Sequence, residues 1–209
     1  MSTHSCIRVL SVDDHPLIRS GIAYDLEGLP DMKLVGSVST GTEALMAYRR
    51  DLPDILLVDL RLPDFDGVEV VTRIRSEFPN ARCVILTTFS GDVQVSRALR
   101  AGAAGYLLKS ALDRDLIDTI RRVNAGHRCI PMEVASELAA YLDADALSER
   151  EIAVLKVVAE GNSNKIVADR LSISEDTVKG HMRNVMMKLC ANDRTHAVLI
   201  AMKRGYLDA

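Results

Sequence analysis

The sequence of 209 residues contains no tryptophan, and aromatic residues make up only 4% of it. Its four cysteines lie far apart, at Cys6, Cys83, Cys129 and Cys190. They form no CxxC pair, and no histidine stands at metal-ligand spacing from them. A zinc site is therefore disfavoured, and we assign the cysteines no function.

Long apolar stretches are also missing, since none approaches the ~18 residues that a membrane-spanning helix requires. The first residues, MSTHSCIRVLSV, lack the basic, apolar and small-residue segments of a signal peptide. We therefore expect a cytoplasmic protein that has no membrane partner.

The chain has enough apolar residues to bury a core, with 48% hydrophobic and 26% charged residues. Its net charge of -3 hides a difference between the two parts of the chain. Residues 1–146 hold 16 Lys and Arg against 21 Asp and Glu, whereas residues 147–209 hold 10 against 8. The mildly basic second part permits nucleic-acid binding but does not establish it.

Strand-like apolar runs alternate with helix-period stretches through the first part of the chain. The strand-like runs are 7–12, 33–38, 54–59, 82–87 and 104–108, and the helical stretches are 16–28, 42–51, 67–78, 92–101 and 112–125. Parallel strands need a crossover connection, which is normally a right-handed helix. The pattern predicts an α/β fold, a (βα)5 doubly wound parallel sheet with helices on both faces.

The pattern changes after this segment, which suggests two domains joined by a linker. We place the first domain at residues 1–126, a linker at 127–146 and a second domain at 147–209. Pro131 stands at a helix-start position, and 131–142 is predicted to form a short amphipathic helix. The second domain is predicted to be small and all-α, with helices at 148–160, 164–171, 175–189 and 193–204.

The predicted strands of the first domain end on residues that phosphoryl chemistry needs. These residues are Asp13 and Asp14, Asp59, Thr87 and Lys109. Reactive groups in an open parallel sheet collect beyond the carboxyl ends of the strands, so these side chains are expected to converge. Carboxylates hold a hard Mg²⁺ ion or attack phosphorus, and a hydroxyl and an ammonium meet the transferred oxygens.

This part of the chain resembles the receiver domain of two-component response regulators. The resemblance runs through DDHP (13–16), DLRLPDFDG (59–67), ILTT (85–88) and GYLLK (105–109). It implies that Asp59 is the phospho-acceptor and that Lys109 pairs with the phosphoryl oxygens. It also implies that Asp13, Asp14 and Asp59 hold Mg²⁺ with the backbone carbonyl of Arg61.

The resemblance assigns two further residues to a conformational switch. An aspartyl phosphate adds charge and acceptor oxygens that can draw the Thr87 hydroxyl and its loop inward. The neighbouring Thr88 is a rival, but alternation along the strand places only one of the two over the site, and the motif favours Thr87. Tyr106 resembles the aromatic residue that turns inward once Thr87 moves, although ordinary packing under a helix is an alternative.

The second domain resembles the LuxR-type helix-turn-helix of NarL/FixJ response regulators. The matching segments are LSEREIAVL (147–155), EGNSNKIVADRLSIS (160–174), EDTVKGHMRNVMMKL (175–189) and NDRTHAVLIAMKRG (192–205). Two residues depart from the family pattern. Ile166 stands where Glu is usual, and Cys190 stands where Gly commonly ends the recognition helix.

The segment 175–189 has the two faces that a recognition helix needs. Its apolar stripe consists of Val178, Met182, Val185 and Leu189, and its polar face consists of Lys179, Gly180, Arg183 and Asn184. Ser174 precedes the helix as a cap. Thr177 lies in the first turn, where free backbone N–H groups can meet a phosphate.

The family pattern makes Lys179 and Arg183 the candidates for base contacts. Gly180 stands where a bulkier side chain is usual, which is explained either by a close approach to the bases or by neutral drift. The remaining candidates, Asn164, Lys165 and Lys188, are predicted to touch phosphates, with a solvated helix surface as the alternative. Two copies of the domain should read an inverted repeat in double-stranded DNA, with the last helix forming part of a homodimer contact.

The favoured interpretation is a transcription regulator rather than a turnover enzyme. A sensor histidine kinase or a small phosphodonor would phosphorylate Asp59, and this would control sequence-specific DNA binding. One alternative is a phosphatase of the haloacid dehalogenase type, but Arg61 stands where that class needs a second acid. Another is a DNA-binding protein controlled by a small molecule or by constitutive dimerisation, which incubation with acetyl phosphate and Mg²⁺ would distinguish.

Overall fold

The computed structural model describes residues 6–88, 92–132, 135 and 146–207. The chain divides into two compact units; the first comprises residues 1–90 and 95–135, and the second comprises residues 91–94 and 136–209. We call them the N-terminal unit and the C-terminal unit and describe each by itself. Most of the helix predicted at 131–142 lies outside the described residues.

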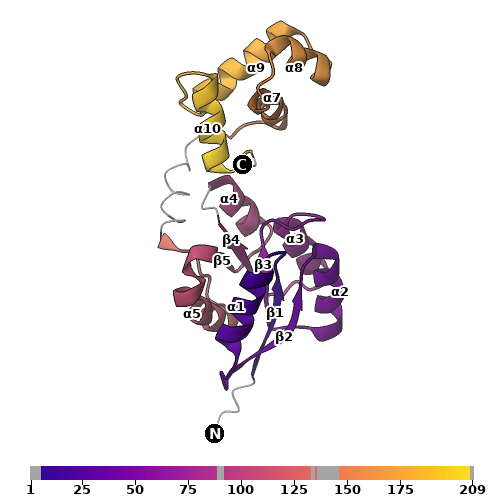
Figure 1. Cartoon of the computed structure of the whole chain (residues 1–209), viewed down its shortest axis with the longest axis vertical. Coiled ribbons are helices and arrows are strands. Elements are labelled where there is room, and N and C mark those ends of the chain that lie inside the picture. Colours follow the sequence, from indigo (N-terminus) through magenta and orange to yellow (C-terminus); the bar gives the residue numbers. More distant parts are fainter. Residues whose placement is uncertain (1–5, 89–91, 133–134, 136–145, 208–209) are drawn as a thin grey trace. The chain divides into compact units, whose positions relative to one another are not determined.

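The N-terminal unit is built on one sheet of five parallel strands (Figure 1). The strands are β1 (Ile7–Val12), β2 (Met32–Val38), β3 (Ile55–Asp59), β4 (Cys83–Thr87) and β5 (Gly105–Leu108). Their spatial order is β2-β1-β3-β4-β5, and every neighbouring pair is parallel. The chain therefore reverses its direction of travel across the sheet between β1 and β3, where open α/β sheets form their ligand crevice.

Helices connect the strands and cover both faces of the sheet. They are α1 (Pro16–Leu26), α2 (Gly41–Asp51), α3 (Gly67–Glu77), α4 (Asp92–Arg100) and α5 (Leu112–Asn124), with a short 3₁₀ turn η1 (Lys109–Ala111) after β5. Helices α1 and α5 lie side by side on one face, and α2 and α3 lie on the other (Figure 1). All residues of β3 and β4 are buried, because these strands are covered on both sides. The predicted (βα)5 fold is confirmed.

Gly67 explains how the chain can turn back against β3 so soon after the strand ends. A Cβ atom at this position would lie 2.1 Å from the carbonyl oxygen of Asp59. Only glycine permits that approach. Helix α3 can therefore begin directly beside the end of β3, with the Asp66 side chain capping its first turn by accepting a hydrogen bond from the Glu69 N–H (2.9 Å).

A single bridge extends the sheet beyond β5, which the sequence did not predict. The backbone N–H of Cys129 donates to the Ala104 carbonyl (3.0 Å), and the Cys129 carbonyl accepts from the N–H of Tyr106 (2.8 Å). One bridge leaves no periodic pattern in a sequence. The segment after α5 is thereby fixed beside the strand that carries Tyr106.

The regular secondary structure in the described part of the C-terminal unit is all helical. Its helices are α7 (Glu149–Ala159), α8 (Asn164–Leu171), α9 (Glu175–Lys188) and α10 (Arg194–Arg204), which agree closely with the predicted ranges. The predicted apolar stripe of α9, which consists of Val178, Met182, Val185 and Leu189, is buried in the core of this unit. No helix in the described part of the chain is long and apolar enough to cross a membrane.

Cys190 adopts the left-handed conformation that usually calls for glycine. Its φ is 51°, and it follows α9 in a tight turn in which the Ala191 N–H donates to the Met186 carbonyl (2.8 Å). Such a conformation is unfavourable for a residue that carries a Cβ atom. The turn forms nonetheless, so the departure from the family pattern does not break the fold.

We predict that Cys190→Gly stabilises the protein by about 0.5–1 kcal/mol, because the relief of backbone strain exceeds the added flexibility of the unfolded chain. Chemical denaturation followed by circular dichroism measures this change. Cys190→Ala is the matched control, since it removes the thiol and keeps the Cβ atom. Equal stability of the two variants would contradict the explanation.

Candidate functional site

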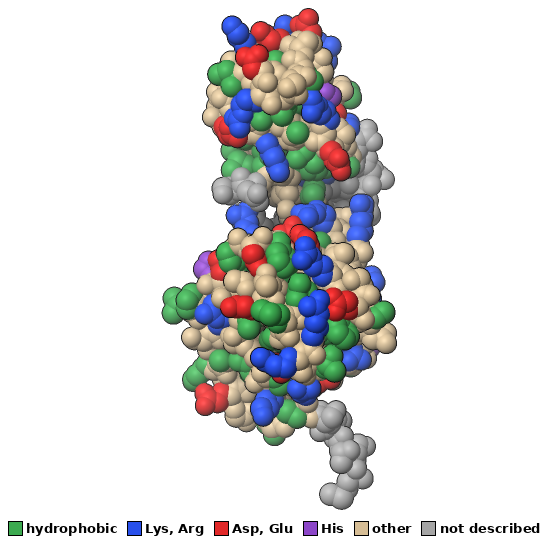
Figure 2. Space-filling model, turned by 90° about the vertical axis from the view of Figure 1, so that its right-hand side faces the viewer, with side chains coloured by type: hydrophobic (Ala, Val, Ile, Leu, Met, Phe, Trp, Pro, Cys, Tyr) green, Lys and Arg blue, Asp and Glu red, His purple; other side chains and the backbone are tan. Residues whose placement is uncertain are grey.

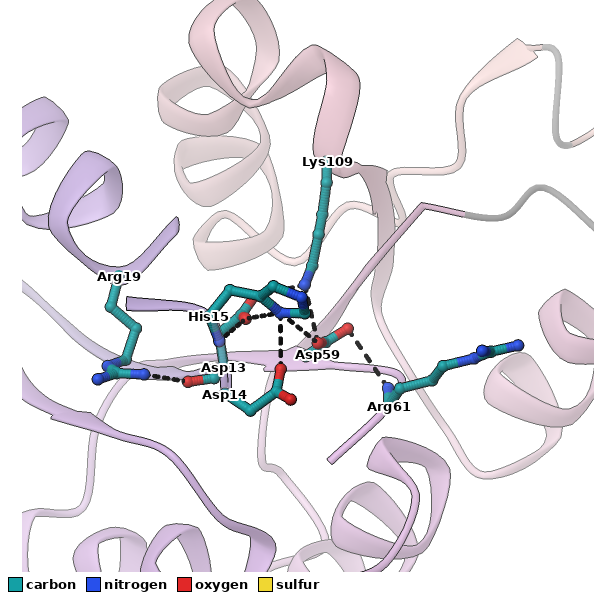
Figure 3. A network of polar contacts seen from close by, with 7 residues as sticks. All are labelled: Asp13, Asp14, His15, Arg19, Asp59, Arg61 and Lys109. Carbon is teal, nitrogen blue, oxygen red and sulfur yellow. Dashed lines mark hydrogen bonds and ion pairs between the residues drawn. The ribbon is translucent and has the colours of Figure 1, made fainter. Parts of the chain in front are cut away.

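Two buried carboxylates and one lysine meet at the carboxyl ends of β1, β3 and β5. Asp13 follows β1 and Asp59 ends β3, and these two strands are neighbours in the sheet. Lys109 follows β5 as the first residue of η1. Its Nζ lies 2.8 Å from Asp13 Oδ2 and donates a hydrogen bond of 2.8 Å to Asp59 Oδ2 (Figure 3). The structure thus brings together three of the predicted site residues.

Burial sets the electrostatics of this cluster. Burial raises the pKa of Asp59; Lys109 opposes that effect and Asp13 adds to it, so the pKa lies above its ordinary value. Burial alone would lower the pKa of Lys109, but its bonds to Asp13 and Asp59 outweigh this and raise the pKa. Lys109 is therefore charged at neutral pH, and the buried acids still favour further positive charge nearby.

Asp14 and His15 complete the cluster on its exposed side. His15 Nδ1 lies 2.6 Å from Asp14 Oδ1, 3.1 Å from Asp13 Oδ1 and 4.0 Å from Asp59 Oδ2. His15 precedes α1 at its N-cap position, but its side chain makes no cap hydrogen bond and turns to the acids instead (Figure 3). We did not predict His15 as a site residue; its position next to the acid pair was the available signal.

Two neighbouring groups hold the backbone around this cluster. Arg19 of α1 donates a hydrogen bond to the Asp13 carbonyl (2.7 Å), a contact that the sequence analysis missed. The N–H of Arg61 donates to Asp59 Oδ1 (3.3 Å), while the Arg61 side chain points away from the acids (Figure 3). The backbone N–H of Arg61, rather than its guanidinium, is therefore the group bonded to Asp59.

The donor set of the cluster fits a divalent cation. Asp13, Asp14, His15 and Asp59 each offer one ligand atom, and these atoms all lie within 4.8 Å of one another. Asp13 Oδ2 is buried and accepts no hydrogen bond of good geometry from the described residues, although it forms the ion pair with Lys109. Carboxylate oxygens are the ligands that Mg²⁺ prefers. The residues present are therefore suited to the metal that the sequence predicted.

The two predicted switch residues lie on the strands next to this cluster. Thr87 ends β4 and is buried, and it stands opposite Leu108, the residue before Lys109, in the register of β4 and β5. Thr88 lies beyond the strand and is exposed, so the preference for Thr87 agrees with its position. Tyr106 is buried within β5. The switch roles of Thr87 and Tyr106 remain predictions.

The polar face of α9 is accessible, as a reading helix requires. Thr177, Lys179, Arg183 and Asn184 are exposed, and a Cβ atom at Gly180 would meet no heavy atom within 4 Å. The Ser174 side chain caps the helix by accepting a hydrogen bond from the Thr177 N–H (3.1 Å). Lys179 Nζ lies 2.9 Å from Asp176 Oδ1, but both side chains are exposed, and such pairs are weak.

The three predicted phosphate contacts occupy different environments. Lys165 is exposed and Asn164 half-buried at the start of α8. In contrast, Lys188 Nζ donates to Glu151 Oε2 (2.9 Å) and to the Ala146 carbonyl (3.1 Å). Glu151 is buried, so Lys188 neutralises a charge inside the C-terminal unit. This placement argues against the phosphate contact that we predicted for Lys188.

The surface charges of each unit are mixed in sign. On the face visible in Figure 2, Lys and Arg side chains are interspersed with Asp and Glu in the N-terminal unit and also in the C-terminal unit. This agrees with the small net charges counted from the sequence. On the face in view, recognition of an anionic partner would therefore depend on particular residues rather than on a large basic surface.

The fold and the cluster together define a receiver domain that is followed by a helix-turn-helix domain. Residues 9–121 match the response regulator receiver domain, and residues 145–201 match the luxR family of bacterial regulatory proteins. The chain belongs to the two-component response regulators with a LuxR-type domain, as in the NarL/FixJ family.

Individual relatives support this assignment over nearly the whole chain. The response regulator protein VraR of Staphylococcus aureus is 36% identical over 206 residues, which cover 96% of this chain and 99% of VraR. RcsB from Salmonella enterica serovar Typhimurium, bound to promoter P1flhDC in the presence of the phosphomimetic BeF3-, has a TM-score of 0.72 and 25% identity over 94% of this chain and 98% of RcsB.

A second solved structure is that of ChrA, a response regulator from a heme-sensing two-component system. It has a TM-score of 0.57 and 32% identity, with 97% of this chain and 100% of ChrA covered. Both of these structures include the two domains. The order of the two domains along this chain is therefore shared by solved response regulators.

We predict that Lys188→Ala destabilises the C-terminal unit by about 1–3 kcal/mol, because it leaves the buried Glu151 carboxylate without its counter-charge. Chemical denaturation measures the loss. Lys165→Ala, an exposed lysine of the neighbouring helix α8, is the control and should change stability by less than about 0.5 kcal/mol. Equal effects of the two substitutions would contradict the structural role of Lys188.

Proposed function

We propose that this protein is switched by phosphorylation of Asp59 and that the switch controls DNA binding by its C-terminal unit. The observation that carries the proposal is the shared lysine, whose Nζ lies 2.8 Å from both Asp13 Oδ2 and Asp59 Oδ2. This geometry puts a carboxylate nucleophile, a cation and a group of metal-binding acids within one small site. Those are the components that phosphoryl transfer to a carboxylate needs.

In the transfer, a carboxylate oxygen of Asp59 forms a bond to phosphorus while the bond between phosphorus and the donor breaks. The donor is the phosphohistidine of a sensor kinase or a small acyl phosphate such as acetyl phosphate, which leaves as histidine or acetate. The residues that would hold Mg²⁺ are Asp13, Asp14 and Asp59, together with the carbonyl of Arg61. Bound Mg²⁺ supplies charge neutralisation for the phosphoryl oxygens, and Lys109 is near enough to pair with them.

The new phosphoryl group would act on the neighbouring strands. An acyl phosphate at Asp59 presents acceptor oxygens near the end of β4, where the Thr87 hydroxyl can donate to them. Tyr106 lies on the adjacent strand β5, and its backbone N–H is bonded to the Cys129 carbonyl in the segment that leads out of the N-terminal unit. We propose that a change at Thr87 is passed through these neighbouring strands to the chain that follows the receiver domain.

The output would be sequence-specific binding of double-stranded DNA by α9. Lys179 and Arg183 are exposed on its polar face and are our base-contact candidates, with Gly180 and Asn184 beside them. Thr177 and, on α8, Asn164 and Lys165 are the candidates for phosphate contacts. The related RcsB forms dimers on DNA, and we propose that a homodimer of this chain reads an inverted repeat.

The two alternatives from the sequence gain no support. A haloacid dehalogenase-type phosphatase needs a second acid two residues after its nucleophile, and the Arg61 side chain at that position points away from the acids. Control without phosphorylation would give no reason for burying two carboxylates beside one lysine. Autodephosphorylation of the aspartyl phosphate remains compatible with the proposal, since it is not turnover of an external substrate.

We predict that incubation with acetyl phosphate and Mg²⁺ adds one phosphoryl group to the wild-type protein and none to Asp59→Ala. Intact-protein mass spectrometry measures the addition. Asp118→Ala removes an exposed carboxylate on α5 and is the matched control, which should be modified like the wild type. Undiminished phosphoryl incorporation into Asp59→Ala would contradict the assignment of Asp59 as the phospho-acceptor.

We also predict that Lys179→Ala and Arg183→Ala each weaken binding to a specific site by ~1–3 kcal/mol, because each removes a contact to a base. The site is first selected from a random duplex pool with the wild-type protein, and affinity is measured by fluorescence anisotropy at fixed salt. Lys203→Ala, which removes an exposed charge at the end of α10, is the control and should bind nearly as the wild type. An equal loss of affinity in all three variants would indicate that the positive charges attract DNA non-specifically, and it would contradict specific base contacts by Lys179 and Arg183.

A further inference from the structure

The loop between β3 and α3, residues 60–66, carries the Arg61 carbonyl and is fixed at its base. The Leu60 N–H donates to the Leu86 carbonyl of β4 (2.8 Å), and the Gly67 N–H donates to the Leu60 carbonyl (2.8 Å). These bonds close the loop between the end of β3 and the start of α3. Between them, the Arg61 N–H donates to Asp59 Oδ1 (3.3 Å), which ties the nitrogen of Arg61 rather than its carbonyl to the site.

The far side of the loop is fixed by Asp64, which binds the first turn of α2. Asp64 Oδ1 accepts a hydrogen bond from the Gly41 N–H (2.8 Å), and Oδ2 accepts from the N–H and the hydroxyl of Thr42 (both 2.8 Å). Although burial opposes it, these bonds lower the pKa of Asp64 to about 2. A carboxylate with several charge-assisted bonds at a helix N-terminus is a firm attachment.

Phe65 adds a packing contact at the same point. A Cβ atom at Gly41 would lie 2.5 Å from a ring carbon of Phe65, so the absence of a side chain at Gly41 lets the ring approach α2. The guanidinium of Arg73, from α3, lies 4.6 Å from the centre of the same ring. Phe65 is thus enclosed between α2 and α3, and the loop is held by both a polar and an apolar contact.

We propose that Asp64 is a positioning residue for the metal site, which it serves by tying the β3–α3 loop to α2 and so fixing the Arg61 carbonyl beside Asp59. This proposal rests on the proposed function, because it needs the Arg61 carbonyl to be a metal ligand. The acids Asp13 and Asp59 are placed by strands, whereas the Arg61 carbonyl belongs to a loop whose far side is attached to α2 through Asp64. Outer-shell contacts of this kind govern metal affinity through the geometry of the ligands.

The test compares Mg²⁺ affinity in four variants of the full chain. Calorimetry measures the dissociation constant directly, which suits a protein that has no tryptophan to report binding by fluorescence. We expect Asp64→Ala to raise the Mg²⁺ dissociation constant about tenfold, the lower end of the effect of losing an outer-shell contact. Asp64→Asn keeps one acceptor oxygen and Thr42→Val removes only the hydroxyl bond, so both should have smaller effects.

Thr40→Ala is the matched control. The Thr40 side chain caps the same helix by accepting a hydrogen bond from the Glu43 N–H (3.2 Å), and its capping partner is Glu43 rather than a residue of the loop. A role of Asp64 that is limited to stabilising α2 would make Thr40→Ala weaken Mg²⁺ binding equally, and this would overturn the proposal. Wild-type affinity in Asp64→Ala would also overturn it.

A kinetic measurement separates a role of Asp64 in placing the Mg²⁺ ligand from a role in the phosphoryl transfer itself. In phosphorylation by acetyl phosphate, Asp64→Ala should need a higher Mg²⁺ concentration for half-maximal rate and should reach the wild-type rate at saturation. A lower maximal rate with unchanged Mg²⁺ dependence would contradict the role. Should Asp64→Ala fail to fold, Asp64→Asn and Thr42→Val carry the same comparison.

The measurement on the wild-type protein distinguishes the positioning role of Asp64 from the proposed phosphorylation switch. Wild-type protein that binds no Mg²⁺ would overturn both. Wild-type protein that binds Mg²⁺ and accepts a phosphoryl group, beside an Asp64→Ala variant that binds Mg²⁺ equally well, would overturn only the positioning role.

Discussion

The ammonium group of Lys109 between two buried carboxylates is the interaction on which the rest of this site depends. Its Nζ lies 2.8 Å from Asp13 Oδ2 and 2.8 Å from Asp59 Oδ2. Two adjacent buried carboxylates would be unfavourable without such a partner, because both desolvation and mutual repulsion oppose their ionised forms. One lysine only partly compensates the two buried acids and the neighbouring Asp14. The remaining negative charge makes this site suited to a divalent cation.

The sheet topology is what makes this arrangement possible. Asp13 and Asp59 are placed by neighbouring strands, whereas Lys109 comes from β5 at the edge of the order β2-β1-β3-β4-β5. Its long side chain spans the distance that the intervening strand β4 creates, and Thr87 at the end of β4 lies between. Each of these groups sits at or directly after a strand end, so the buried sheet positions them.

The C-terminal unit separates the side chains that pack in its core from those that remain accessible. Helix α9 buries Val178, Met182 and Val185 and leaves Lys179 and Arg183 exposed. Lys188 belongs to the packing side, because its ammonium neutralises Glu151. One helix can therefore be held firmly in the unit and still present side chains to a ligand, which is the requirement for reading DNA in a groove.

Much of this structure could be predicted from local pattern. The limits of most elements agree with the predicted ranges because apolar runs mark the strands and because Pro16 and Ser174 mark the starts of α1 and α9. The acids and Lys109 could be placed because parallel strands bring their carboxyl ends to one edge.

What could not be predicted depends on contacts between distant residues. The attachment of Asp64 to Gly41 joins residues 23 apart, and the pairing of Lys188 with Glu151 joins residues 37 apart. Neither leaves a periodic signal in the chain. The orientation of His15 is local, but its residue type suits a helix start and a metal ligand equally, so only coordinates decide between them. The single bridge at Cys129 is too short to give the sequence pattern from which a strand is predicted.

Borohydride reduction of the phosphorylated protein tests the central claim most directly. Borohydride converts an aspartyl phosphate, but not a free carboxylate or a phosphoserine, to homoserine, and peptide mass spectrometry then locates the converted residue. After treatment with acetyl phosphate and Mg²⁺, the account predicts homoserine at position 59 alone. Homoserine at another aspartate, or its appearance at position 59 to the same extent when Mg²⁺ is withheld, would contradict it.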